Sequence, residues 1–114
     1  GSTVEFISMW KQMMFGSHIM LWKDGKLTFA PQPAIPAYLV PEDGRVSAML
    51  FGKTKVTYQF PAVADYMPGQ YEIGRMEFVY ENGTRATVEG AFACGRLAED
   101  LRNGKMTEVF INIL

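Results

Sequence analysis

Cysteine and histidine are almost absent from this chain, which contains one of each. The single cysteine, Cys94, excludes a disulfide within the chain and any zinc site built from several cysteines. The single histidine, His18, belongs to no motif that would link it to a nucleophile or to a group that orients its ring. We therefore expect neither a metal site nor a catalytic histidine.

Long apolar runs and a surplus of one charge are also absent. No stretch reaches the ~18 consecutive apolar residues that a membrane-spanning helix needs, and no signal peptide is recognisable. Eleven basic and 12 acidic residues give a formal net charge of −1, so the chain as a whole has no electrostatic attraction for nucleic acid or anionic lipid. These absences predict a cytoplasmic protein whose partners are neither nucleic acids nor membranes.

Motifs of common enzymes and cofactor sites are missing too. The chain has no EF-hand loop, no HExxH motif, no phosphate-binding glycine loop and no Gly-x-Ser-x-Gly nucleophile elbow. Its adjacent carboxylates, Glu42-Asp43 and Glu99-Asp100, lie beside a predicted turn and on the exposed side of a predicted helix, not in an apolar pocket. We expect no catalytic residues and no cofactor.

A β-hairpin between residues 72 and 89 is the clearest positive signal, because apolar and polar residues alternate on both sides of Asn82-Gly83. A two-residue turn would mix the two faces. A three-residue loop with Gly83 in the left-handed conformation pairs Tyr80 with Thr84 and sorts the faces. This register predicts an antiparallel sheet with one wet face. Its further pairs are Phe78 with Ala86, Met76 with Val88, Arg75 with Glu89 and Glu77 with Thr87.

A second hairpin is predicted over His18–Ala30, around Asp24-Gly25. A two-residue turn pairs Trp22 with Leu27, and a three-residue turn pairs Leu21 with Leu27. Both registers give an apolar face, so the pattern leaves the register open. It indicates a strand pair that is covered on both sides.

The remaining strands follow from turn signals and alternation. Four prolines between residues 31 and 41 predict an extended connector. Arg45–Phe60 is typical of strand, turn and strand, and Pro61–Gln70 of a loop with one helical turn near Ala62–Tyr66. The apolar segment Glu108–Leu114 predicts a strand inside the sheet or one paired across a subunit boundary.

One helix is predicted over about Ala91–Asn103, because apolar side chains from Cys94 to Leu101 recur at helical spacing. Gly104 then stands where a left-handed C-cap belongs. This helix buries Cys94 in the core. A competing interpretation continues the preceding strand through Cys94 and begins the helix near Arg96.

The whole chain, residues 1–114, is expected to form one α+β domain that is mostly β. Gly1-Ser2 is interpreted as a cloning scar, and residues 3–19 as a leader or a swapped N-terminal strand, with Thr3–Met9 extended. The predicted architecture is a bent antiparallel sheet or small barrel of about six or seven strands, with one helix near the C-terminus. Its predicted core consists of Phe29, Leu50, Val56, Tyr58, Phe60, Met76, Phe78, Val88, Leu97, Leu101, Val109 and Ile111.

Function is predicted only at the level of class. The apolar strands exceed what one helix and one sheet face can cover, which favours a non-catalytic binding or interaction module that acts as a homodimer. The alternative is a small enzyme or carrier for an apolar small molecule bound between sheet and helix. The residues expected to bind such a ligand are Trp22, Tyr58, Asp65, Tyr66, Tyr80 and His18.

Overall fold

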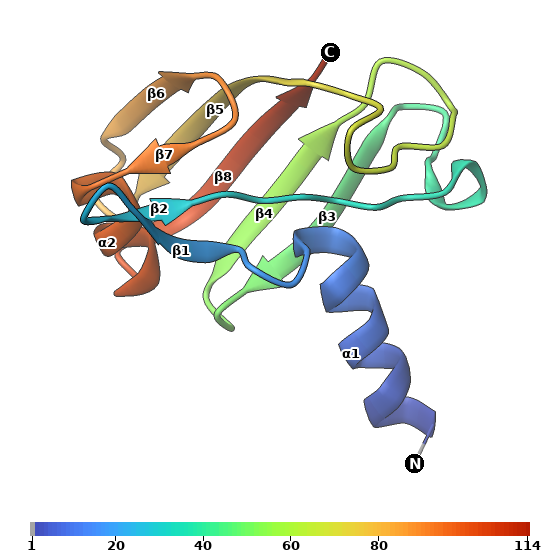
Figure 1. The fold of residues 1–114 in the computed structure, drawn as a ribbon, viewed down its shortest axis with the longest axis horizontal. Coiled ribbons are helices and arrows are strands. Elements are labelled where there is room, and N and C mark those ends of the chain that lie inside the picture. Colours follow the sequence, from blue (N-terminus) through green and yellow to red (C-terminus); the bar gives the residue numbers. More distant parts are fainter. Residues whose placement is uncertain (1) are drawn as a thin grey trace.

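A computed structural model describes residues 2–114, with side chains described from Met9 onward (Figure 1). As predicted, the chain is α+β and mostly β, but two α-helices are present in this range where one was expected. The elements are α1 (Ser2–Phe15), β1 (Met20–Lys23), β2 (Lys26–Phe29), a 3-10 turn (Ala37–Leu39), β3 (Arg45–Leu50), β4 (Thr54–Gln59), β5 (Ile73–Tyr80), β6 (Arg85–Glu89), β7 (Ala93–Cys94), α2 (Arg96–Arg102) and β8 (Met106–Ile113).

The strands form two layers (Figure 1). The larger sheet has five strands in the order β3-β4-β8-β5-β6, and the smaller sheet has three in the order β1-β2-β7. All neighbours are antiparallel except β4 and β8, which run parallel. The larger sheet does not close into a barrel, because β3 and β6 remain its edges.

The strand β8 lies at the centre of the larger sheet, as predicted for an apolar internal strand. Val109, Ile111 and Ile113 are buried toward the smaller sheet. The alternate residues Phe110 and Asn112 point to the other face and reach solvent. The centre of the molecule is therefore packed on one side of β8 and exposed on the other.

The β5–β6 hairpin has the register that the sequence predicts. Tyr80 N–H donates to the Thr84 carbonyl at 2.8 Å, and Gly83 has a φ of +86°. Phe78 lies opposite Ala86. A left-handed residue in a three-residue loop is the conformation that glycine tolerates best, so the turn and the sorting of faces agree. The other predicted pairs, Met76 with Val88, Arg75 with Glu89 and Glu77 with Thr87, are also present.

The β1–β2 hairpin, whose register was open, uses the two-residue turn. Asp24 and Gly25 have φ values of +53° and +77°, both left-handed. Such a turn matches the twist of paired strands, and it places Trp22 opposite Leu27. The strand β2 is covered on both sides, because Thr28 is buried as fully as its neighbours.

The N-terminal prediction was wrong, since Thr3–Met9 lies within the helix α1 and not in a strand. The reason is visible in the residues that follow. Trp10, Met13 and Met14 continue the apolar pattern at helical spacing, which outweighs a short alternation in the first residues. A helix therefore takes the place of the predicted swapped strand. Its C-terminal end lies at the two layers, and its N-terminal part extends away from them (Figure 1).

The second helix begins where the competing interpretation placed it, but the strand before it is not continuous, because β6 ends at Glu89 and β7 belongs to the smaller sheet. Cys94 ends β7 and is exposed, and α2 begins at Arg96. Between them Gly95 has a φ of +73°, which breaks the helical path before α2. The burial predicted for Cys94 is therefore wrong. The helical turn expected near Ala62–Tyr66 is an irregular loop instead.

The core lies between the larger sheet on one side and the smaller sheet and α2 on the other. Ten of the twelve predicted core residues are buried, while Val88 and Leu97 are half-buried. Tyr58, Phe78 and Leu101 are completely enclosed. Phe29 and Phe78 meet edge to face across the layers, with ring centroids 6.1 Å apart.

Candidate binding face

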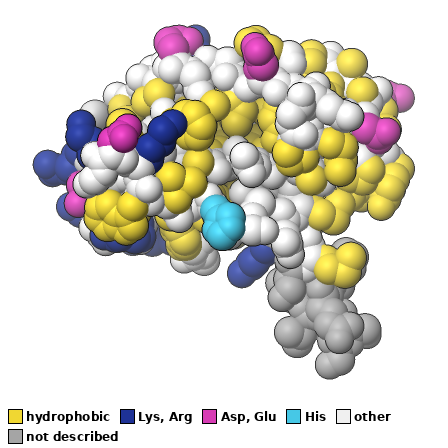
Figure 2. Space-filling view, in the orientation of Figure 1, with side chains coloured by type: hydrophobic (Ala, Val, Ile, Leu, Met, Phe, Trp, Pro, Cys, Tyr) yellow, Lys and Arg dark blue, Asp and Glu magenta, His cyan; other side chains and the backbone are white. Residues whose placement is uncertain are grey.

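The structure does not bring the six predicted ligand-binding residues together. His18 and Trp22 lie near the β1–β2 hairpin and are exposed, Trp22 to 69%. Figure 2 shows this side of the molecule, with the histidine on the surface among scattered apolar side chains. Neither residue borders the space between the larger sheet and α2, where the ligand was expected.

Tyr58 is buried and holds α1 against the sheet. Its hydroxyl donates to the Met14 carbonyl at 2.6 Å. Burial raises the pKa of Tyr58 well above its ordinary value, and the nearby Tyr71 adds to that shift. Tyr58 is therefore a neutral hydrogen-bond donor whose acceptor is already supplied by the protein.

Asp65 and Tyr66 brace two loops. Asp65 Oδ1 accepts the N–H of Ala37 at 2.7 Å, and Tyr66 donates to the Ala62 carbonyl at 2.7 Å. Backbone hydrogen bonds between Ile35 and Tyr66 complete the link. Both predicted site residues thus fix the proline-rich connector to the loop after β4.

The hydroxyl of Tyr80 donates a hydrogen bond to the buried carboxylate of Asp100 at 2.7 Å. Burial, followed by this hydrogen bond, raises the pKa of Tyr80 to about 12. The hydrogen bond from Tyr80 lowers the pKa of Asp100; burial opposes that effect, and Arg96 and Lys105 lower the pKa further. This group joins α2 to β5.

The space between sheet and helix is filled by the side chains of the core. Among the described residues, no buried side-chain nitrogen or oxygen lacks a hydrogen-bond partner. A buried polar group aimed into an enclosed site would leave such an atom. The interior therefore offers no polar anchor for an enclosed ligand within the part of the chain that the structure describes.

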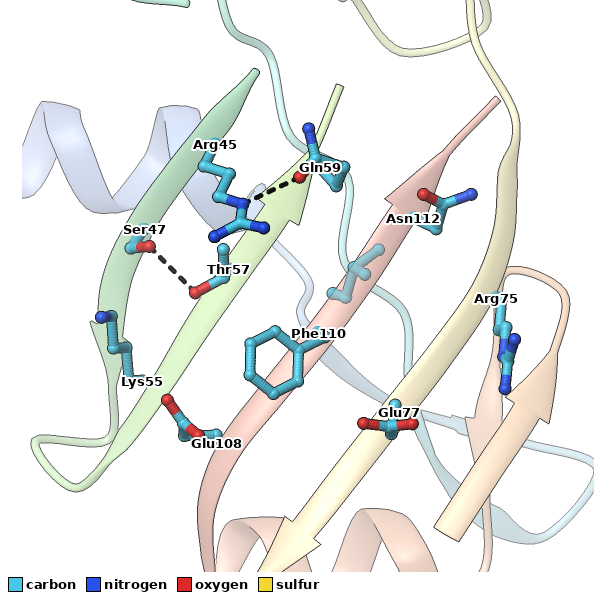
Figure 3. A pocket seen from close by; sticks show the side chains of 11 residues that line it. Arg45, Ser47, Lys55, Thr57, Gln59, Arg75, Glu77, Glu108, Phe110 and Asn112 are labelled. Carbon is cyan, nitrogen blue, oxygen red and sulfur yellow. Dashed lines mark hydrogen bonds between the residues drawn. The ribbon is translucent and has the colours of Figure 1, made fainter. Parts of the chain in front are cut away.

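A hollow of about 660 Å³ lies instead on the opposite side of the larger sheet. Figure 3 views it from that side, so the strands appear in the reverse order of Figure 1. We call this surface the open face. It is built from alternate residues of β3, β4, β8 and β5, which the strand register arranges in rows across the sheet.

Two rows form the floor of the open face. Strand pairing places the members of each row on neighbouring strands, ~4.8 Å apart, and the rows themselves lie ~7 Å apart. The arginine row consists of Arg45, Gln59, Asn112 and Arg75; the phenylalanine row consists of Ser47, Thr57, Phe110 and Glu77. Beyond the phenylalanine row, Lys55 and Glu108 are register partners on β4 and β8.

Phe110 is the aromatic member of this polar surface. Its side chain is 38% exposed and stands between Thr57 and Glu77. It forms no aromatic pair with any of the described residues. The exposed part of the Phe110 ring is thus available to another molecule.

Charges on the open face are distributed unevenly. Glu77 is paired with Arg85, and Arg75 Nε lies 3.9 Å from Glu89 Oε1. Arg45 instead donates from Nε to Gln59 Oε1 at 3.0 Å and has no ion pair with a described residue. The nearby carboxylate of Asp43 accepts the backbone N–H of Arg45 at 3.0 Å and forms no ion pair with its guanidinium.

The two hydroxyl groups of the open face pair with each other. Ser47 Oγ and Thr57 Oγ1 are hydrogen-bonded to each other at 2.9 Å, and neither has a histidine beside it.

Within residues 2–114 as described, no group of three histidine, cysteine or acidic side chains is placed to hold a metal ion. No described helix is long and apolar enough to cross a membrane.

Comparison with known proteins adds no assignment: no family model matched the chain, and no curated protein or solved structure was significantly similar.

Sequence reasoning missed the open face, although part of its signal was present. The alternation of residues 108–114 already set Phe110 and Asn112 apart from the buried side of the strand. What the sequence did not contain was the position of β8 between β4 and β5. Only that arrangement brings Arg45 and Phe110 onto one surface.

Proposed function

We propose that the protein is a small, non-catalytic binding module that holds a small molecule on the open face of its larger sheet. The observation that carries this proposal is Phe110, an exposed aromatic side chain at the middle of a polar, charged hollow. The hollow has about 660 Å³, within the range of ~300–1,000 Å³ typical of small-molecule sites. The apolar-ligand alternative loses support, because buried side chains fill its expected location.

A binding role is favoured over catalysis by the state of the polar groups. The carboxylate of Glu77 is paired with Arg85, and the hydroxyls of Ser47 and Thr57 are paired with each other. A nucleophile needs a base within hydrogen-bond reach. Neither hydroxyl is hydrogen-bonded to a carboxylate or an amine among the residues that line the hollow. The same groups are well suited to orient a bound molecule.

The proposed module also self-associates as a homodimer through α1. This helix projects from the body, and Met9 near its middle is 63% exposed (Figure 1). Helices of its length, 14 residues, are marginal in water unless an apolar side packs against something. A second copy supplies the same helix and can pair with it symmetrically. The molecular mass in solution tests this part of the proposal.

Thermal denaturation in the presence of a small-molecule library tests the binding proposal. Compounds that raise the melting temperature of the wild type should lose this effect with Phe110→Ala, because the ring is the central contact. The matched control is Phe92→Ala, which removes another half-exposed phenylalanine, 49% exposed, from a loop outside the open face. Shifts that survive Phe110→Ala, or a library without any stabilising compound, would contradict the proposal.

A further inference from the structure

We propose that the ligand of the open face is an aromatic anion, whose ring stacks on Phe110 while its anionic group lies on the arginine row. This inference rests on the proposed function and specifies the chemical class of the ligand. It follows from the order of charges across the sheet, from the free donors of the row, and from the distance between the row and the phenylalanine.

The arginine row contains only donors and amides. Arg45 and Arg75 stand at its ends, and Gln59 and Asn112 lie between them, so the row holds no carboxylate. Glu89 lies beyond Arg75, at the 3.9 Å separation of an exposed and weak ion pair. An anion placed over Asn112 thus meets positive charge on both sides.

Within this row the amide of Gln59 already donates to the Asp43 and Phe60 carbonyls, so the donors open to a ligand are those of Arg45 and Asn112. A guanidinium carries five N–H groups, and Arg45 uses Nε toward Gln59, which directs the remaining donors over the sheet (Figure 3). The side chain of Asn112 makes no hydrogen bond with a described residue, so its amide is also available. Planar guanidinium groups bind carboxylates and phosphates with two parallel hydrogen bonds.

The opposite side of Phe110 carries mixed charge, because Glu108 and Lys55 are register partners there. Glu108 precedes Phe110 by two residues on β8 and projects from the same face, as Asn112 does on the other side. An anion beside Glu108 would be repelled. The strand β8 therefore offers the ring one favourable direction for an attached negative group, toward Asn112.

The spacing fits a small molecule. Phe110 and Asn112 are two residues apart on one strand, so the ring and the anion site are separated by ~7 Å. This distance matches an aromatic ring joined to a carboxylate or a phosphate by a short linker. Next to the ring, the Ser47–Thr57 hydroxyl pair keeps one hydrogen free to donate to such a ligand.

Isothermal titration calorimetry with two matched pairs of compounds tests the inference. The first pair is 1-naphthylacetate and its neutral amide; the second is adenosine monophosphate and adenosine. At least one anion should bind about tenfold more tightly than its neutral analogue, the effect expected of a charge-assisted hydrogen bond. The pair that shows the preference identifies the anionic group as carboxylate or phosphate.

Variants locate the preference on the sheet. Arg45→Gln should abolish the preference for the anion, while Lys26→Gln, the same loss of charge on the exposed end of β2, should leave it unchanged. Phe110→Leu should lower the affinity for the anion and the affinity for its neutral analogue equally. Equal binding of anion and analogue in both pairs, with loss of both in Phe110→Leu, overturns the inference but leaves the proposed function standing. Absence of binding in all four titrations overturns the inference, whereas the proposed function fails only if the library also contains no stabilising compound.

Discussion

At the scale of single residues, Asp100 is a carboxylate whose partners are supplied by the protein itself. It is the only charged side chain that is buried among the described residues. Tyr80 donates to it, Arg96 Nε lies 3.3 Å from Oδ1, and Lys105 Nζ lies 3.7 Å from the same atom. Two hydrogen bonds and one ion pair therefore hold this carboxylate between helix and sheet.

Asp100→Asn should lower the free energy of unfolding at neutral pH by about 1–3 kcal/mol, because Tyr80, Arg96 and Lys105 lose their charged partner. The folded protein holds the pKa of Asp100 below its value in the unfolded chain. The stabilisation is therefore complete above pH ~4 and is lost as the pH falls through the lowered pKa. Urea unfolding at several pH values measures it.

The neighbouring substitution Glu99→Gln is the control for that experiment, since Glu99 is exposed on the same helix. It should change stability little at any pH. A difference between wild type and Asp100→Asn that persists undiminished at pH 2 would show that the ionised carboxylate is not its source.

At the scale of elements, the described hydrogen bonds between α1 and the rest of the chain lie at the C-terminal end of the helix. Backbone hydrogen bonds join Ala34 N–H to the Met13 carbonyl at 2.7 Å and Gln32 N–H to the Phe15 carbonyl at 3.1 Å. With the Tyr58 hydroxyl, these bonds secure only the last turn. The remainder of the helix extends away from the two sheets (Figure 1).

Light scattering after size-exclusion chromatography should give a mass of twice 12.8 kDa at tens of micromolar protein. Met9→Glu should weaken the dimer by about tenfold or more, because a charge then enters an apolar helix contact. Met67→Glu, at a methionine that is 43% exposed on the loop before β5, is the matched control and should remain dimeric. A monomeric wild type, or equal effects of both variants, would contradict pairing through α1.

Elements differ in how far the sequence determined them. The β5–β6 register was predictable, because one local choice at Gly83 sorts every side chain in the hairpin. The β1–β2 register was not, because β2 is buried on both sides and both registers look apolar. The start of α2 depended on the φ of Gly95, a single backbone angle that composition does not reveal.

At the scale of the whole molecule, one sheet separates a packed interior from an exposed surface. Three of the six candidate residues chosen from the sequence are tyrosines and one is an aspartate, and in the fold these four make hydrogen bonds within the protein. Met14, the partner of Tyr58, is 44 positions away in the chain, and Asp100, the partner of Tyr80, is 20 positions away. The open face depends on a parallel pairing of β4 with β8, which the predicted antiparallel sheet did not contain.

The measurement that tests the central claim most directly is a titration of the ¹⁵N-labelled protein with 1-naphthylacetate and adenosine monophosphate, followed by NMR chemical shifts. If the open face is the binding surface, the largest shifts should occur at the Asn112 side-chain amide, the Arg45 Nε–H and the backbone N–H groups of Thr57 and Phe110. Backbone signals of α2 and of the β1–β2 hairpin should stay in place. Shifts concentrated on α2 or that hairpin, with the amides around Phe110 unmoved, would contradict the account.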